Sequence, residues 1–445
     1  MLGAGAAGLA AARALGEAGL AVGVLEARAR PGGRIHTVHE ADGVPIELGA
    51  EFLHGAARET VDALRGSGAH LIAVAEGHFV AAGGITRQRD DYWERVGQVL
   101  ARLDPSPGGE RPVAEAFRAL GASPADAEPA GLAAQYVEGF HAADLARISE
   151  RAVARAEQGG SGGGSESRRI AEGYDAVTAA LLHGLPAGVT LRLGAAVTTV
   201  RWRRGEVAVT TRAGAVLHAR AAVVTLPLGV LKAPAGAEGA VAFEPALESV
   251  AAKRAALAAL EMGAAARLVL RFRERWWPEE MSFLHLPGAR SFGIWWTRAP
   301  LTTPLLTGWI GGPPARRLLA RVREAHGLRG AHSGAYSDDA ALARALAAEA
   351  LPELAERCGL APARLAELLA GAYLHDWIAD PLARGAYSYA AVGGLEAGAA
   401  LAAPLDDTLF FAGEATTDAT RHGTVDGALA SGRRAADEVR AALLS

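Results

Sequence analysis

Three glycines near the start of the chain have the spacing of a phosphate-binding turn. They form a G-x-G-x-x-G pattern, and a stretch rich in Ala and Leu follows at once. The first glycine of such a pattern permits a tight turn, the second lets backbone amides approach a pyrophosphate, and the third lets a helix pack on a strand. Glu26, at the end of an apolar stretch over 20–25, suits the hydroxyls of an unphosphorylated ribose. The pattern predicts a dinucleotide-binding βαβ unit with the phosphate loop Gly3, Ala4, Gly5, Ala7 and Gly8.

A second glycine pair continues the motif beyond Glu26. The chain runs on as E-A-R-A-R-P-G-G-R over 26–34, and E-L-G-A follows at 47–50. A domain that binds NAD has no need of this second loop, whereas a longer dinucleotide needs it against its pyrophosphate and its far half. The residues therefore point to FAD as the cofactor. The additional cofactor contacts expected here are Ala27, Arg28, Gly32, Gly33, Arg34, Gly49, Ala50 and Glu51.

The end of the chain carries further motifs, and with them the chain resembles the flavin-containing amine oxidases. Residues 377–389 match the W-x-x-D-P-x-x-x-G-S-Y-S-Y pattern of polyamine oxidases and histone demethylases, with Ala386 in place of the first serine. Residues 411–414 match F-A-G-E, and residues 423–428 match the last family motif, with Asp426 where histidine is commoner. The resemblance implies non-covalent FAD, because 416–422 lacks the cysteine through which monoamine oxidases attach it. It also implies cofactor contacts at Val197, Thr225, Pro227, Trp377, Tyr387, Gly413, Glu414, Thr424 and Val425.

A helix that begins near Thr424 and Val425 has a physical use in this setting. Reduction of a flavin builds negative charge at N1 and at the C2 carbonyl, and a helix N-terminus offers unpaired amides and a positive dipole end. Glu414, just after a short strand, suits the ribityl or ribose hydroxyls. We therefore expect the first and last helices to converge on one bound molecule, one at its diphosphate and the other at its ring.

The resemblance assigns catalytic positions to Arg267, Tyr387 and Thr424. Tyr387 would form one wall of the aromatic cage beside the substrate amine, and Thr424 stands where monoamine oxidases place a second tyrosine. Arg267 stands where relatives carry a lysine that holds a water against flavin N5. Two interpretations stay open: Arg267 faces the flavin and alters its reoxidation by oxygen, or it holds a carboxylate or a backbone carbonyl. Expected substrate contacts are Glu51, His54 and Tyr387, although isolated residues such as Glu51 and His54 are more often structural hydrogen bonders.

These motifs must be positioned by a chain of 445 residues, which is longer than one core usually serves. We expect an α/β fold, with a Rossmann-like FAD-binding domain of the GR2 type and an interleaved α+β substrate-binding domain. The expected segments are 1–55, 168–232 and 385–445 for the FAD-binding domain, 56–167 for a helical cap, and 233–384 for the mixed α+β substrate-binding domain.

Local patterns refine this outline. Only Met1 and Leu2 precede the first glycine, so either the true start lies upstream or the first strand is a stub. A helix is expected over 245–261 and a strand over 267–272, and the segment 159–165, G-G-S-G-G-G-S, suits a surface loop.

Composition narrows the classes of function. The net charge is −4, which gives no sign of a nucleic-acid partner or an anionic membrane surface. No apolar run reaches the roughly 18 residues of a membrane span. The single Cys358 excludes an intramolecular disulfide, and no stretch has metal-ligand spacing, so no metal is expected. We expect a cytoplasmic protein whose partners are a small-molecule amine and molecular oxygen, with the oligomeric state left open.

Three functions are consistent with these residues. The first is FAD-dependent oxidation of an amine C–N bond by hydride transfer to flavin N5, which gives an imine, an aldehyde and hydrogen peroxide. The second is a desaturase or protoporphyrinogen-type oxidase, which shares the FAD domain but acts on C–C bonds; the motif over 377–389 argues against it. The third is a flavoprotein without turnover, which only Arg267 and the short first strand support.

Overall fold

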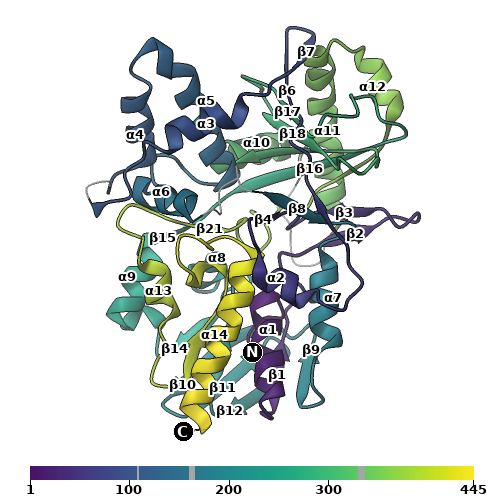
Figure 1. Ribbon diagram of the computed structural model, residues 1–445. Helices are drawn as coiled ribbons and strands as arrows, with labels where there is room; N and C mark the ends of the chain where they lie inside the picture. Colours follow the sequence, from purple (N-terminus) through teal and green to yellow (C-terminus); the bar gives the residue numbers. More distant parts are fainter. Residues whose placement is uncertain (108–109, 160–165, 329–335, 445) are drawn as a thin grey trace.

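A parallel sheet near the base of the molecule carries the glycine-rich turn (Figure 1). The computed structural model describes residues 1–107, 110–159, 166–328 and 336–444, so most of the predicted 159–165 loop lies outside the described residues. Leu2 is a one-residue stub of the first strand, and it forms parallel bridges to Leu25 on one side and to Val224 on the other. The order across the sheet is β9 (Val189–Arg192), β1 (Val22–Leu25), the stub, β13 (Ala222–Val224) and β22 (Leu409–Phe411).

The first and last helices lie side by side in this lower part of the molecule (Figure 1). They are α1 (Ala6–Glu17) and α14 (Val425–Leu444), and α7 (Asp175–His183) also contacts α1. Two glycines allow the close packing. A Cβ on Gly8 would lie 2.1 Å from the carbonyl oxygen of Gly3, and one on Gly432 would lie 2.3 Å from that of Ala7. The third glycine of the motif therefore has the packing role predicted for it.

A second, four-stranded sheet extends the lower part. Its hairpins turn at Gly205 and Gly214, which have φ values of 75° and 83°, a region that favours glycine. The helix predicted over 245–261 is wrong in its extent, because the segment 260–262 pairs with a distant strand and tertiary pairing overrides helix propensity here. The elements are β12 (Val216–Ala219), β11 (Glu206–Thr211), β10 (Val197–Arg203), β14 (Ala242–Glu244), η2 (Leu247–Ser249), α9 (Ala251–Ala259), β15 (Leu260–Met262) and its partner β21 (Ser388–Ala390).

A seven-stranded sheet forms the upper right part of Figure 1. Leu268, Leu270 and Phe272 point from β16 into its core, as their alternation predicts, and helices α10 and α11 cover that face. The hairpin of β6 and β7 adds the last two strands, so part of the segment 56–167 belongs to this sheet. The elements are β20 (Leu369–Tyr373), β16 (Ala265–Phe272), β19 (Leu305–Gly311), β18 (Ile294–Thr297), β17 (Phe283–His285), β6 (His78–Ala82), β7 (Ile85–Gln88), α10 (Gly312–Ala325), α11 (Tyr336–Cys358) and α12 (Pro362–Leu368).

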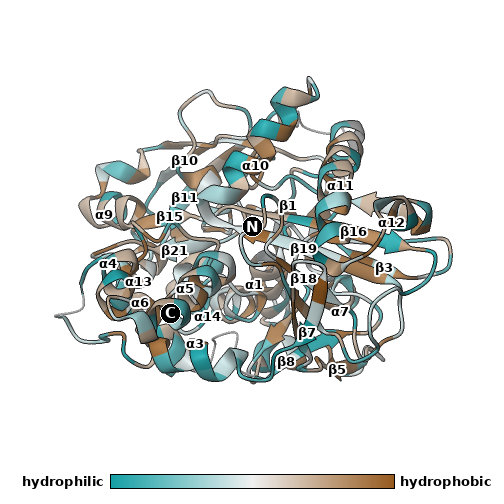
Figure 2. Ribbon diagram, turned by 90° about the horizontal axis from the view of Figure 1, so that it is seen from above, coloured by the Kyte–Doolittle hydropathy of each residue, from teal (hydrophilic) through white to brown (hydrophobic). Residues whose placement is uncertain are grey.

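The helices of the expected cap have a core of their own at the upper left of Figure 1. They are α3 (Tyr92–Leu100), α4 (Val113–Leu120), α5 (Pro124–Phe140) and α6 (Glu150–Gln158). Ser123 and Ser149 cap α5 and α6 with their hydroxyl oxygens. In the view from above, hydrophilic teal segments lie at the periphery, for example on α3 (Figure 2). Among the described residues, no helix is long and apolar enough to cross a membrane.

Short elements connect these layers. They include β2 (Thr37–His39), β3 (Pro45–Glu47), β4 (Leu53–His54), α2 (Arg58–Ala63), β5 (Leu71–Ala73), β8 (Ser167–Ile170), α8 (Leu228–Leu231), α13 (Ala397–Ala402) and η3 (Glu414–Thr416). The division into a discontinuous FAD-binding domain, a cap and a substrate-binding domain remains a proposal.

Candidate active site

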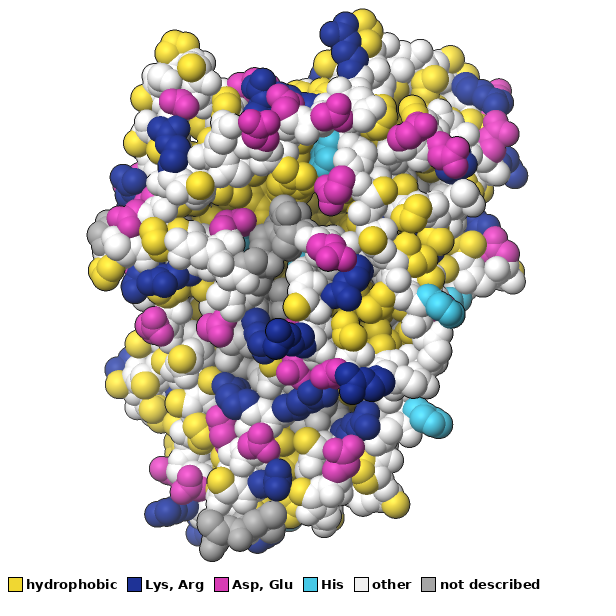
Figure 3. Space-filling model, viewed as in Figure 1, with side chains coloured by type: hydrophobic (Ala, Val, Ile, Leu, Met, Phe, Trp, Pro, Cys, Tyr) yellow, Lys and Arg dark blue, Asp and Glu magenta, His cyan; other side chains and the backbone are white. Residues whose placement is uncertain are grey.

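One cavity of about 920 Å³ is lined by residues from the lower sheets, the cap and the seven-stranded sheet. Gly5 and Ala6 at the start of α1 line it, and so do Thr424 and Val425 at the start of α14. The two helix starts therefore open into the same cavity. Figure 3 shows a hollow lined by hydrophobic side chains between the two upper lobes of the molecule.

At the α1 end, the backbone offers unpaired donors. The amides of Ala7 and Gly8 have no acceptor among the described residues, which is the usual state of a helix N-terminus. Glu26 is buried, and its carboxylate accepts hydrogen bonds from the amides of Ala4 at 2.8 Å and Arg28 at 2.9 Å. Arg28 also pairs with Asp380 at 2.7 Å. This end can receive a diphosphate and still present carboxylate lone pairs to a ribose.

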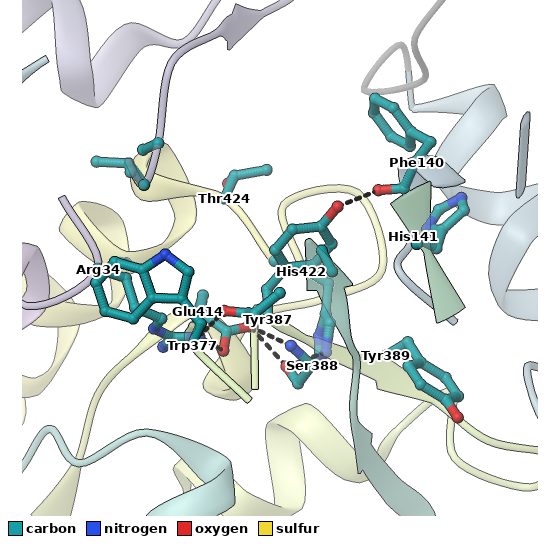
Figure 4. A pocket seen from close by; sticks show the side chains of 18 of the residues that line it. Arg34, Phe140, His141, Trp377, Tyr387, Ser388, Tyr389, Glu414, His422 and Thr424 are labelled. Carbon is teal, nitrogen blue, oxygen red and sulfur yellow. Dashed lines mark hydrogen bonds and ion pairs between the residues drawn. The ribbon is translucent and has the colours of Figure 1, made fainter. Parts of the chain in front are cut away.

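A chain of polar groups lies further along the cavity (Figure 4). Arg34 Nη1 lies 2.9 Å from Glu414 Oε1, and Ser388 Oγ lies 2.6 Å from both Glu414 Oε2 and His422 Nε2. Burial alone would raise the pKa of Glu414. The electrostatic effect of Arg34 and His422 and the hydrogen bond from the Ser388 hydroxyl outweigh burial, so the net pKa is lowered. Glu414 is therefore an ionised carboxylate that already has partners on both oxygens.

The start of α14 provides the second set of unpaired donors. Thr424 Oγ1 accepts from the amide of Gly427 at 2.9 Å and donates to the carbonyl of Arg421 at 2.7 Å, so its side chain caps the helix. The amides of Val425 and Asp426 have no acceptor in the part of the chain that the structure describes. A group that gains negative charge would be stabilised beside them.

Tyr387 stands in the cavity wall, and the cap holds it there. Its hydroxyl donates to the carbonyl oxygen of Phe140, the last residue of α5, at 2.6 Å (Figure 4). Trp309 Nε1 donates to the neighbouring carbonyl of Gly139 at 3.0 Å. Burial raises the pKa of Tyr387, so its phenol stays protonated. Tyr389 points away from Tyr387 in Figure 4 and packs into the cap core, as the strand alternation predicts.

Arg267 belongs to a buried charge cluster around Glu51. Glu51 Oε1 lies 2.8 Å from Arg169 Nε, and its Oε2 lies 3.3 Å from Arg267 Nη2 and 2.9 Å from Trp296 Nε1. Arg267 Nη1 also donates to the carbonyl of Glu47 at 3.2 Å, and the guanidinium stands 5.4 Å from the centre of the Trp296 ring. Arg267 thus holds a carboxylate and a carbonyl, as the second interpretation expects, and it also lines the cavity; its facing the flavin remains a prediction.

Aromatic rings form most of the wall on the substrate side. Trp296 and Trp309 line the cavity, whereas Trp277 and Trp295 pack in the core of the seven-stranded sheet. Three imidazoles in the wall are uncharged near neutral pH, because burial lowers the pKa of His54 and of His141 to about 4 and that of His285 to about 3. The other rings in the wall are Phe52, His78, Tyr92, Trp93, Tyr136, Phe140 and Phe283.

Nearly all residues singled out from the sequence meet at this cavity. Ala4 and Gly8 are the exceptions: both are buried behind the glycine turn. His54 also bonds Ser167 Oγ at 2.9 Å, so it and Glu51 both have structural partners, and the binding roles of the whole set remain predictions. The lining members are Gly3, Gly5, Ala7, Glu26, Ala27, Arg28, Gly32, Gly33, Arg34, Gly49, Ala50, Glu51, His54, Val197, Thr225, Pro227, Arg267, Trp377, Tyr387, Gly413, Glu414, Thr424 and Val425.

Sequence reasoning missed several groups at the site. The carbonyl of Phe140 and the arginine Arg169 come from segments whose local pattern carries no chemical motif. Ser388 and His422 lie inside recognised motif regions, but only the folded chain brings Ser388 to Glu414 and His422.

Comparison with known proteins agrees with this geometry. The family model described as flavin containing amine oxidoreductase matches residues 6–76 and 95–440. Polyamine oxidase 2 of Arabidopsis thaliana is 29% identical, covering 100% of this chain and 88% of that protein. Lysine-specific histone demethylase 2 of Homo sapiens is 27% identical, covering 99% of this chain and 53% of that protein.

Solved structures agree in fold. A putrescine oxidase bound to putrescine is 20% identical and covers 99% of this chain and 98% of its own, with a TM-score of 0.72. The family match covers most of the sequence, including Glu26, Glu414 and the start of α14, and it begins at residue 6, just after Gly3 and Gly5. The chain therefore belongs to the flavin-containing amine oxidoreductase family, and its cofactor is FAD.

Proposed function

We propose that this protein oxidises an amine at the C–N bond. The carbon beside the nitrogen loses a hydride and the nitrogen loses a proton. Water hydrolyses the imine formed to an aldehyde and ammonia or a smaller amine, and molecular oxygen takes up two electrons and two protons as hydrogen peroxide. Bound FAD supplies the two-electron acceptor for the hydride. The observation that carries the proposal is the single cavity into which both helix starts and Tyr387 open.

The residues present suit that cofactor. Unpaired amides stand at both helix starts, at Ala7 for a diphosphate and at Val425 and Asp426 for the redox-active ring. The segment 416–422 contains no cysteine, so the cofactor is held without a covalent bond from there. We infer that Glu26 binds the adenosine ribose and that Arg34, through Glu414, fixes the polar chain beside the ribityl hydroxyls.

The protein's contribution to the reaction is to orient the amine and to remove water around it. The Tyr387 hydroxyl is occupied by the Phe140 carbonyl, so the face of the ring is what Tyr387 presents to a substrate. Aromatic surroundings favour the neutral form of the amine, which hydride loss requires. Thr424 positions the start of α14, and its unpaired amides stabilise negative charge that develops during the reaction.

A panel of amines tests the proposal. The yellow, flavin-loaded protein should lose its absorbance when an amine substrate is added without oxygen, and it should form peroxide when oxygen returns. Loss of absorbance with a C–C desaturation substrate and with no amine would instead support the desaturase function. The panel should include mono-, di- and polyamines, amino acids and aromatic amines. If none of them bleaches the flavin, amine oxidation is contradicted.

A further inference from the structure

We propose that the substrate is a monoamine whose tail is uncharged and aromatic or otherwise apolar, rather than a di- or polyamine. This inference rests on the proposed amine oxidation and concerns what the far wall of the same cavity accepts. It differs from what the names of the polyamine and putrescine oxidase relatives suggest, and it depends on the charged groups that line the wall.

The far wall is built from stacked rings. His285 stacks on Tyr92 with ring centres 4.2 Å apart, and His78 stacks on Tyr92 and on Phe283 at 4.8 Å each. His78 and His285 also bond each other through their ring nitrogens at 3.0 Å. Such surfaces bind apolar and aromatic groups through area and ring contacts.

Nearer Tyr387, a second group of rings continues the wall. Phe140 contacts the rings of His54 at 5.2 Å and of Tyr136 at 5.2 Å, and Phe52 contacts that of Trp296 at 5.5 Å. An alkyl or aryl tail that starts at Tyr387 therefore meets aromatic rings on several sides.

Almost all carboxylates that line the cavity already have hydrogen-bond or ion-pair partners. Among the described lining residues they are Glu26, Glu51, Glu138, Glu414 and Asp426. Glu26 and Glu414 serve the cofactor end, and Asp426 accepts from the amide and hydroxyl of Thr60 at 3.0 and 3.3 Å. A second or third ammonium group would need an unpaired carboxylate in the wall, because burial of an unpaired charge is costly.

Glu51 cannot serve that purpose. It pairs with both Arg169 and Arg267, and Arg298 is a further cation close enough to lower its pKa. These three arginines outnumber the one ionised carboxylate that they surround. The local excess of positive charge repels a remote ammonium group and leaves a neutral tail unaffected.

Glu138 is the one carboxylate in the described lining that has no hydrogen-bond or ion-pair partner. It is half-buried near the end of α5, and burial raises its pKa to about 6. One such group close to Arg317 is a poor match for a polycation, and it supplies the direct test of the alternative.

The test compares amines that differ only in a second charge. Rates of anaerobic flavin bleaching are measured for the flavin-loaded protein with butylamine against putrescine and with pentylamine against cadaverine. We expect kcat/KM for each monoamine to exceed that for the diamine of the same length by about tenfold or more. A diamine that is as good as its matched monoamine, or better, overturns the inference while amine oxidation stands. Absence of bleaching with every amine removes amine oxidation itself, and the inference with it.

Two variants sharpen the result. His141→Glu places a carboxylate in the wall where the present Nε2 has no partner, and it should raise the diamine-to-monoamine ratio about tenfold over the neutral control His141→Gln. Glu138→Gln should leave that ratio unchanged, and a selective loss of diamine turnover in this variant would show that Glu138 binds a second ammonium and would refute the inference. If His141→Glu does not retain its flavin, the matched substrate pairs and the Glu138→Gln variant still test whether the wall accepts a second ammonium group.

Discussion

Removal of the charge on Glu51 should destabilise the protein far more than removal of a surface carboxylate. Glu51 and its partners Arg169 and Arg267 have side chains only 6%, 4% and 7% exposed. Loss of one partner of a buried ion pair typically costs about 3–5 kcal/mol, because the remaining charges stay buried and uncompensated. Glu51→Gln keeps an oxygen that can accept from Trp296 Nε1. We therefore expect the free energy of unfolding to fall by about 3 kcal/mol, near the lower end of that range.

The matched control is Glu206→Gln. Glu206 pairs with Arg203 at the surface, where the two side chains are 49% and 80% exposed, and such pairs contribute about 0–1 kcal/mol. Thermal and urea unfolding of both variants should show a fall in Tm of several degrees for Glu51→Gln and almost none for the control. Equal effects of the two substitutions would refute the assignment of Glu51 as the counter-ion of a buried arginine cluster.

The pH dependence gives a second measure of the same effect. Burial acts to raise the pKa of Glu51, but Arg169 and Arg267 outweigh it and the net pKa is lowered. A group with a lowered folded-state pKa stabilises the fold above its ordinary pKa, and that contribution disappears as pH falls through the folded-state value. The stability difference between wild type and Glu51→Gln should therefore shrink in acid.

Three other predictions follow from single contacts. Burial raises the pKa of Glu47 from 4.5 to about 7, so its contribution should make the protein less stable as pH rises between those values, and Glu47→Gln should flatten that part of a Tm-versus-pH curve. Arg267→Lys should speed reoxidation of the reduced enzyme by oxygen several-fold in stopped-flow absorbance; an unchanged rate would remove Arg267 from that step. Gly8→Ala forces a Cβ to within 2.1 Å of the Gly3 oxygen and should yield protein with little flavin, whereas Gly23→Ala, which meets nothing within 4 Å, should keep its yellow colour.

The cofactor half of the site was predictable because its chemistry is local. The spacing of Gly3, Gly5 and Gly8 depends on one turn, and the unpaired amides at the start of α14 follow from where a helix begins. Strand alternation over 267–272 also puts Arg267 on the face opposite Leu268 and Leu270. These features depend on neighbours within a few residues, and the amino-acid order alone contains them.

The tertiary structure determines which residues become partners when they lie far apart in the chain. Glu51 meets Arg169 and Arg267, and the hydroxyl of Tyr387 meets the carbonyl of Phe140, across separations that no local pattern encodes. The charge state of the cavity wall depends on burial in the folded chain, which lowers the pKa of His141 to about 4. The sequence by itself therefore determined which cofactor the chain holds, while packing between distant segments built the cavity wall on which the proposed preference for a monoamine rests.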